Sequence, residues 1–183
     1  CMLTLPGTNY TAAARCGSLE VAENPDDPNG HRINLNIAMA PATGKTSEPD
    51  PVFFFAGGPG QAASETWVMI RPVLNKIRKT RDIIMIDQRG TGGSNKLECK
   101  SEIEEDLNQE IDLELVRAET EKCLAELDGD PRFYNTTIAM GDYNLVREAM
   151  GYDSINIMGV SYGTRAAQVY LRLFPETVRT MTL

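Results

Sequence analysis

Apolar positions recur with two spacings along this chain, and the two spacings alternate. Short runs that are apolar throughout, or that alternate with polar residues, predict β-strands at 17–22, 32–40, 52–56, within 82–87, at 154–160 and at 178–183. Stretches with apolar residues every three or four positions predict helices at 64–79, 101–127, 135–150 and 164–174. Buried strands that alternate with helices predict an α/β domain, in which helices cover both faces of a mostly parallel sheet.

The first two strands and the last one depart from this repeating pattern. Turn-forming residues at 24–30 separate the strands at 17–22 and 32–40, so these two are expected to pair antiparallel. The strand at 178–183 carries no stop signal, and a domain that ended there would leave an unpaired strand edge. We therefore expect residues 1–183 to be the N-terminal part of a longer protein, with a sheet that is incomplete at its C-terminal side.

The composition and charge of the chain indicate which class of protein it is and which partners are unfavourable. Hydrophobic residues make up 42% of the 183 residues and charged residues 24%, which is typical of a globular domain with a sizeable core. The formal net charge of −8 argues against nucleic acid and anionic membranes as partners. No apolar run approaches the ~20 residues that a membrane-spanning helix needs, so no membrane span is expected.

The four cysteines fall into two local pairs, Cys1 with Cys16 and Cys99 with Cys123. Their even number and the absence of a Cys-x-x-Cys spacing favour disulfides over a metal site, so no metal is expected. Disulfides would indicate an exported protein. Reduced thiols in a cytosol are the alternative, and a lipid anchor is a third interpretation of Cys1.

The strongest chemical signal is the sequence Gly-Val-Ser-Tyr-Gly at 159–163. It follows one predicted strand and precedes a predicted helix, which is the context of a nucleophile elbow. Ser161 would sit at a strained turn that admits only small neighbours two positions away, and both of those positions are glycine. A serine that merely caps the helix is the alternative interpretation.

Two further motifs follow the strands at 52–56 and 82–87. Gly-Gly-Pro-Gly at 57–60 either presents backbone N–H groups to a developing oxyanion or forms a plain tight turn. We interpret Asp-Gln-Arg-Gly-Thr-Gly-Gly-Ser at 87–94 as a structural loop with an internal pair between Asp87 and Arg89. All three motifs follow the carboxyl ends of strands, where α/β sheets place their sites.

Taken in this order, the three motifs resemble the α/β-hydrolase superfamily and, within it, the proline iminopeptidase and tripeptidyl aminopeptidase group of serine peptidases. The cysteine-bracketed acidic segment, expected to be a helical insertion at about 99–134, and the Arg-Cys-Gly sequence at 15–17 look more like the secreted tripeptidyl-type branch. One departure is Ala56, where many relatives carry a histidine. That histidine is not the triad base, so the replacement does not affect the assignment of the nucleophile. It concerns how the oxyanion loop is held in place.

The resemblance implies a role for four residues of these motifs. Ser161 would be the nucleophile of an α/β-hydrolase fold. The backbone N–H of Tyr162 would be one donor of the oxyanion hole, and the N–H of Gly58, or else of Gly57, would be the other.

The remaining members of a catalytic triad are not apparent in this chain. In the family the acid and the histidine follow the serine. After Ser161 this sequence has Glu176 as its one acid and no histidine, while its one histidine, His31, lies far upstream. Neither residue is expected to belong to the triad, so the acid, the histidine and the substrate-covering cap are expected beyond Leu183.

The resemblance thus implies an exported serine peptidase, secreted or periplasmic, that releases amino acids or short peptides from peptide N-termini through an acyl-enzyme. Its partners would be a peptide or small-molecule substrate and the remainder of the parent chain, with no metal or organic cofactor. An esterase or lipase, and a non-catalytic binding domain that lacks the base, are the alternatives. A further alternative is that a second chain supplies the missing half. We expect the 183 residues alone to be inactive, with disulfides Cys1–Cys16 and Cys99–Cys123.

Overall fold

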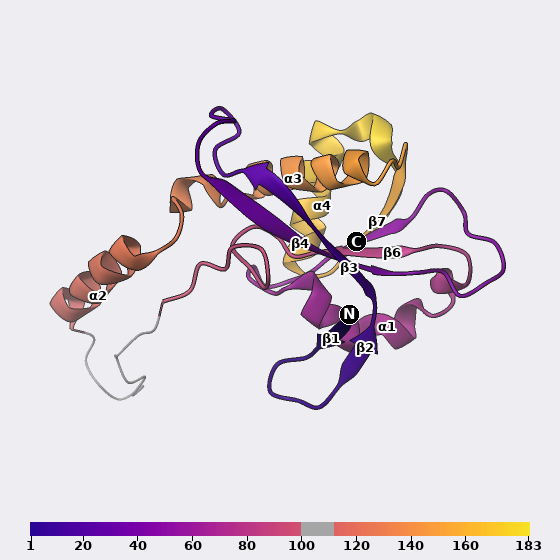
Figure 1. Ribbon diagram of the computed structural model, residues 1–183, viewed down its shortest axis with the longest axis horizontal. Helices are drawn as coiled ribbons and strands as arrows, with labels where there is room; N and C mark the ends of the chain where they lie inside the picture. The colour runs from indigo at the N-terminus through magenta and orange to yellow at the C-terminus, as the bar shows by residue number, and fades with distance from the viewer. Residues whose placement is uncertain (100–111) are drawn as a thin grey trace.

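A computed structural model describes residues 1–99 and 112–183 of the chain, and its centre is a six-stranded sheet (Figure 1). The strands are β1 (Met2–Thr4), β2 (Thr11–Ala13), β3 (Arg15–Ala22), β4 (Arg32–Ala40), β5 (Val52–Phe55), β6 (Ile83–Ile86), β7 (Ile155–Gly159) and β8 (Val178–Thr182). The helices are α1 (Ala63–Leu74), α2 (Leu113–Glu126), α3 (Thr136–Ala149) and α4 (Tyr162–Leu173), with short 3₁₀ helices η1 (Ile77–Lys79), η2 (Pro131–Phe133) and η3 (Pro175–Thr177).

The strand order in the sheet is β3-β4-β6-β5-β7-β8. Strand β5 is parallel to its neighbours β6 and β7, and β8 is parallel to β7. Strands β3 and β4 form an antiparallel pair along the full length of β3, and β4 joins the parallel strands through an antiparallel pairing with β6. The sheet is therefore mixed but mostly parallel, and the expected antiparallel pairing of the two opening strands is confirmed.

Helices cover both faces of this sheet, as the alternating pattern predicts. Phe53 and Phe55 of β5 belong to the core that packs under α3 and α4. Phe54, between them, belongs to the opposite core, together with Trp67 of α1. Figure 1 shows α1 on one side of the sheet and α3 and α4 on the other. Burial on both faces explains why the sequence of β5 is apolar at every position.

The N-terminal hairpin is a part of the fold that the hydrophobic pattern did not predict. Strands β1 and β2 pair over three residues, too few for a periodic signal. Leu3 and Ala12 nevertheless pack into the core on the α1 face of the sheet. The disulfide between Cys1 and Cys16, whose Cα atoms are 5.9 Å apart, joins the hairpin to β3 and confirms the first predicted pairing.

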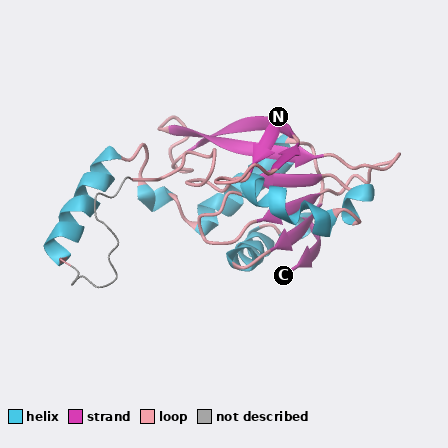
Figure 2. Ribbon diagram, turned by 90° about the horizontal axis from the view of Figure 1, so that it is seen from below, coloured by secondary structure: helices cyan, strands magenta, loops and turns pink. Residues whose placement is uncertain are grey.

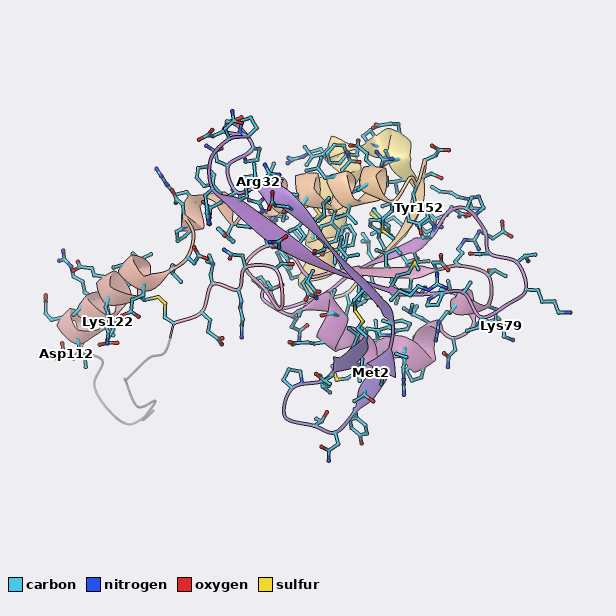
Figure 3. All side chains as sticks on the ribbon, viewed as in Figure 1. Met2, Arg32, Lys79, Asp112, Lys122 and Tyr152 are labelled. Carbon is cyan, nitrogen blue, oxygen red and sulfur yellow. A yellow bond between two sulfur atoms is a disulfide. The ribbon has the colours of Figure 1, made fainter. Side chains whose placement is uncertain are left out.

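Helix α2 lies apart from the sheet (Figures 1 and 2) and has no buried residue. Figure 3 shows Asp112, directly before this helix, and Lys122 on it, away from the body of the domain. The second predicted disulfide, between Cys99 and Cys123, is present with a Cα–Cα distance of 5.6 Å. Residues 101–111 of the helix predicted at 101–127 lie outside the described residues.

Two helix boundaries differ from the prediction for local reasons. The helix predicted at 64–79 ends at Leu74, because Pro72 lies in its last turn and Asn75 bonds back to the Pro72 carbonyl in a tighter turn. The helical spacing of apolar residues extends as far as Ile77 because the 3₁₀ helix η1 follows α1. The helix predicted to begin at 164 begins at Tyr162, directly after Ser161.

The internal pair expected between Asp87 and Arg89 is wrong. The Arg89 guanidinium, fully buried, instead binds both carboxylate oxygens of Asp142 in α3, at 2.6 and 2.8 Å. Its other N–H groups donate to the backbone carbonyls of Ala22, Glu23 and Phe133. Spacing along one loop could not reveal a partner that lies 53 residues away. Arg89 thus fastens the loop at 87–94 to α3 and to the end of β3.

Asp87 is also buried, and backbone and side-chain donors form hydrogen bonds to both of its carboxylate oxygens. Its carboxylate accepts hydrogen bonds from the backbone N–H and hydroxyl of Ser64, both at 2.9 Å, and from the Asn36 amide at 2.8 Å. The Gly93 N–H adds a fourth bond at 3.1 Å. These bonds tie the start of α1, strand β4 and the loop together, so the interpretation of 87–94 as a structural loop agrees with the contacts.

A polar cluster at the amino ends of the parallel strands holds the outermost strand β8. Asp50 forms ion pairs with Arg81 at 3.1 Å and with Arg179 of β8 at 3.2 Å, and it accepts a hydrogen bond from the Asn156 amide at 2.7 Å. The Asn156 carbonyl oxygen in turn accepts from the Thr180 hydroxyl of β8 at 2.6 Å. The cluster therefore connects the loop before β5 with β7 and β8.

The Asp50 cluster predicts a specific dependence of stability on pH. Burial raises the pKa of Asp50, but the hydrogen bonds from Asn156 and Arg81 and the charges of Arg81 and Arg179 outweigh it and lower the pKa below its ordinary value. A carboxyl whose pKa is lowered by folding stabilises the protein above its unfolded-state pKa of ~3.9, and this stabilisation is lost as the pH falls through the folded-state pKa. We expect Asp50→Asn to lower the free energy of unfolding by ~1–3 kcal/mol at pH 7.

Denaturation by urea between pH 7 and pH 3 measures this effect. The difference between wild type and Asp50→Asn should be constant down to about pH 5 and should shrink below about pH 4. Asp153→Asn, at an exposed position before β7, is the matched control and should change the stability little. A difference that grows on acidification would contradict the assignment.

Candidate functional site

Ser161 occupies a sharp turn between β7 and α4. Its backbone angles, φ 55° and ψ −121°, lie outside the regions that residues with a side chain ordinarily adopt. The residue is exposed, and its side chain makes no capping hydrogen bond to α4. The alternative interpretation of a helix-capping serine is therefore wrong, and the hydroxyl is available for other chemistry.

Glycines leave the backbones around this turn in close contact. A Cβ atom on Gly159 would lie 2.6 Å from the carbonyl oxygen of Gly163, and one on Gly163 would collide with the carbonyl oxygen of Phe55. A Cβ atom on Gly57 would lie 3.2 Å from the Cβ of Ser161. The absence of side chains at these three positions thus lets β5, β7, α4 and the loop after β5 approach one another.

The loop at 57–60 presents its backbone beside Ser161. Gly58 and Gly60 have positive φ values of 102° and 106°, which only glycine adopts without strain. The N–H groups of Gly57 and Gly58 have no acceptor within the described part of the chain. Tyr162 is the first residue of α4, and the first N–H groups of a helix have no acceptor within that helix. Backbone donors therefore flank Ser161 on two sides.

The side chain of Tyr162 makes a contact that sequence reasoning missed. Its hydroxyl lies 2.7 Å from the hydroxyl of Thr136, the first residue of α3. The preceding Asn135 caps α3 by accepting a hydrogen bond from the N–H of Ile138 at 3.1 Å. No local sequence pattern predicts the bond between Thr136 and Tyr162, because it joins the starts of two helices that are distant in the sequence.

A small recess between the loop at 57–60 and the start of α4 contains two amide side chains. Gln61 and Gln88 line it, and neither side chain has a hydrogen-bond partner among the described residues. Tyr143, at the same recess, donates its hydroxyl to the Ile86 carbonyl at 2.8 Å. Burial, and then the charge of Asp87, raises the pKa of Tyr143, so this group stays neutral. The Gln61 side chain thus lies close to Gly57, whose backbone also adjoins Ser161.

The structure brings neither His31 nor Glu176 to Ser161. The two ring nitrogens of His31 lie 3.4 Å from a carboxylate oxygen of Glu23 and 3.5 Å from one of Asp128. Its side chain is 45% exposed at the turn between β3 and β4, and β4, β6 and β5 lie between β3 and β7. Glu176 lies in η3, beyond the carboxyl end of α4, whereas Ser161 lies at its amino end. Neither of these two residues therefore lies beside the serine.

Within 1–99 and 112–183, no helix is both long and apolar enough to cross a membrane. In those same ranges, no group of three or more histidine, cysteine, aspartate or glutamate side chains could hold a metal ion.

Comparison with known proteins places these motifs in a family. A family model described as the alpha/beta hydrolase fold matches residues 50–183. The chain is 28% identical over 198 residues to the serine protease Hip1 of Mycobacterium tuberculosis, an alignment that covers 100% of this chain and 38% of that protein. It is 28% identical over 192 residues to a tripeptidyl aminopeptidase of Streptomyces lividans, which covers 96% of this chain and 36% of that protein. The chain thus spans well under half the length of these relatives.

Solved structures agree on the fold. A proline iminopeptidase from Mycobacterium smegmatis superposes with a TM-score of 0.57 at 15% identity, covering 90% of this chain and 42% of that one. A probable hydrolytic enzyme from Pseudomonas aeruginosa gives a TM-score of 0.60 at 14% identity, covering 96% and 42%. The family match over residues 50–183, the strand order and the turn at Ser161 lead to one conclusion: this chain belongs to the alpha/beta hydrolase fold family.

Proposed function

We propose that Ser161 is the nucleophile of a serine hydrolase of the peptidase type, which releases amino acids or short peptides from peptide N-termini. One observation carries the proposal: an exposed, uncapped serine stands at a strained strand-to-helix turn, against the backbone of Gly57. Relatives named as a serine protease and as a tripeptidyl aminopeptidase support the peptidase class.

The reaction would proceed through an acyl-enzyme. The Ser161 oxygen attacks the scissile carbonyl carbon and gives its proton to a base, while the carbonyl electron pair moves onto the oxygen. The N–H groups of Tyr162 and of Gly58, or else of Gly57, stabilise that oxyanion. Collapse breaks the C–N bond, the leaving amine takes the proton, and water then hydrolyses the serine ester. In this proposal the amide of Gln61, which lies close to Gly57, binds a polar group of the substrate.

In this proposal the base and the acid come from outside the 183 residues. The chain has one histidine, and both of its ring nitrogens face carboxylates at the far side of the sheet. The remainder of a parent chain is the proposed source, together with a cap over the substrate. A second chain that supplies the same groups is the alternative.

Two other functions use the same fold. An esterase has the same machinery, and a relative named carboxylesterase B from Mycobacterium tuberculosis is 28% identical over 109 residues, covering 58% of this chain and 21% of that protein. A non-catalytic binding domain would keep the turn at Ser161 and lack the base. The identity to the two peptidase-named relatives extends over at least 96% of this chain, which favours the peptidase.

The proposed location is outside the cytosol, secreted or periplasmic. Both cysteine pairs form disulfides, and disulfides persist in oxidising compartments. Each closes a short loop, of 15 and 24 residues in sequence separation, which in a chain-entropy description stabilises the fold by ~3 kcal/mol.

Replacement of the nucleophile tests the proposal directly. In the full-length parent, Ser161→Ala should abolish labelling by a fluorophosphonate and lower the hydrolysis of aminoacyl amides by roughly 10³- to 10⁶-fold. Wild-type chain 1–183 should show neither labelling nor turnover, because a serine hydroxyl without a base is a poor nucleophile. A parallel assay with short acyl esters separates the peptidase from the esterase.

Two results would contradict this assignment. Turnover by chain 1–183 that equals the parent's, and that is lost in Ser161→Ala, would show that the base lies within these residues. A parent that neither reacts with the phosphonate nor hydrolyses either class of substrate would indicate the non-catalytic binding domain.

The oxyanion loop gives a second prediction, for Gly57→Ala in the parent. The added methyl group would lie 3.0 Å from the Gln61 side-chain oxygen, 3.2 Å from the Cβ of Ser161 and 3.3 Å from the Val160 carbonyl oxygen, so Gln61 and the loop with its N–H donors must shift. We expect kcat/KM to fall by roughly 10- to 100-fold, mainly through kcat. Gly141→Ala in α3, where the new Cβ meets nothing within 4 Å, is the matched control. The control should keep its activity and gain ~0.5–1 kcal/mol of stability, and equal kcat/KM values in the two variants would refute the role of the loop.

A further inference from the structure

A polar cleft of about 590 Å³ opens between the amino end of α3 and the outer face of α4. Its wall on α4 carries Arg165, Gln168 and Arg172, and its wall on α3 carries Thr136 and Thr137. No carboxylate is among the described residues that line it. The proposed reaction does not use any of these side chains.

The two arginines are exposed and have no partner in the described part of the chain. Two buried or partly buried arginines, by contrast, pair with carboxylates: Arg81 binds Asp50, and Arg89 binds Asp142. Two unpaired guanidinium groups in one cleft without a carboxylate make a local positive site on a chain of net charge −8.

The cleft borders α4 from its first turn onward, and α4 begins directly after Ser161. Ser161, Arg165, Gln168 and Arg172 follow the spacing that places helical residues on a single stripe. A rise of 1.5 Å per residue puts Arg165 about 6 Å and Arg172 about 16 Å along the axis from Ser161. At the rim, the bond between the hydroxyls of Thr136 and Tyr162 connects the cleft to the residue that follows the serine.

We propose that this cleft binds a carboxylate of the substrate peptide on the leaving side of the bond at Ser161, an inference that rests on the proposed function. Guanidinium groups match carboxylates in geometry and charge. An extended peptide advances about 3.3–3.6 Å per residue, so a carboxylate roughly two to five residues beyond the scissile bond reaches the space between Arg165 and Arg172. The preferred substrates are therefore short peptides with a free C-terminal carboxylate, or longer ones with an acidic side chain at that distance.

Binding to the Ser161→Ala form of the full-length parent tests the cleft without turnover. Three probes with a free N-terminus are titrated by calorimetry at low salt: hexaalanine with a free carboxylate, its carboxamide, and the amidated peptide Ala-Ala-Ala-Ala-Asp-Ala. We expect the carboxamide to bind at least about tenfold more weakly than the better of the two carboxylate probes, since a charge-assisted hydrogen bond is lost. The tighter of those two probes identifies the source of the carboxylate.

Variants at the two arginines assign that difference to the cleft. Arg165→Gln with Arg172→Gln should bring the carboxylate probes to the affinity of the carboxamide. Arg15→Gln removes an exposed arginine of β3, which also has no described partner, and should leave all three affinities unchanged. Salt should weaken only the carboxylate-dependent part.

Two outcomes would overturn the inference: equal affinity for the carboxylate and carboxamide probes, or a preference for carboxylate that survives the double substitution. A separate measurement, fluorophosphonate labelling of the wild-type parent, shows whether the proposed function itself fails. A labelled parent with no carboxylate preference would overturn the cleft alone, and an unlabelled parent that binds carboxylate through these arginines would overturn the reaction alone.

Discussion

The backbones of β5, β7 and α4 meet at a point where a Cβ atom does not fit, and the candidate site depends on this contact. Gly163 lies against the Phe55 carbonyl, and Gly159 lies against Gly163. Only this proximity allows the chain to turn from strand to helix at Ser161 with a positive φ. Such a backbone costs ~1–3 kcal/mol and persists where the surroundings over-determine it. Here Phe55 packs edge-on against Tyr143, with ring centroids 4.6 Å apart, so the strand under the turn is held firmly.

Buried charge in this domain has a structural role rather than a catalytic one. Arg89 and Asp87 lie in the loop that follows β6. Other groups of the protein occupy the N–H donors of Arg89 and the carboxylate oxygens of Asp87. Their partners come from α3, β4 and the start of α1, so the loop at 87–94 is a junction of three elements. The Asp50 cluster has a similar role at the amino ends of the parallel strands, where it holds β8. Removal of one partner from a buried ion pair is strongly destabilising, so both groups of contacts fasten the sheet to its neighbouring elements.

The sequence predicts those features that local pattern determines. Apolar runs located the strands of the central sheet, and the glycines around Ser161 located the strained turn. Sequence proximity also predicted the disulfides, since the cysteines of each pair are 15 and 24 residues apart. Features that depend on tertiary contact escaped prediction. Arg89 pairs with a residue of α3 and not with its neighbour Asp87, and the hydroxyl of Tyr162 bonds to Thr136.

The most direct measurement is a crystal structure of the full-length parent after reaction with a peptidyl phosphonate. We expect a covalent bond between phosphorus and the Ser161 oxygen, with a phosphonyl oxygen about 3 Å from the N–H of Tyr162 and from that of Gly58 or Gly57. A histidine from outside residues 1–183 should lie within hydrogen-bonding distance of the serine oxygen. An adduct on another residue, or a phosphonyl oxygen directed away from both backbone donors, would contradict the role of Ser161 as the nucleophile.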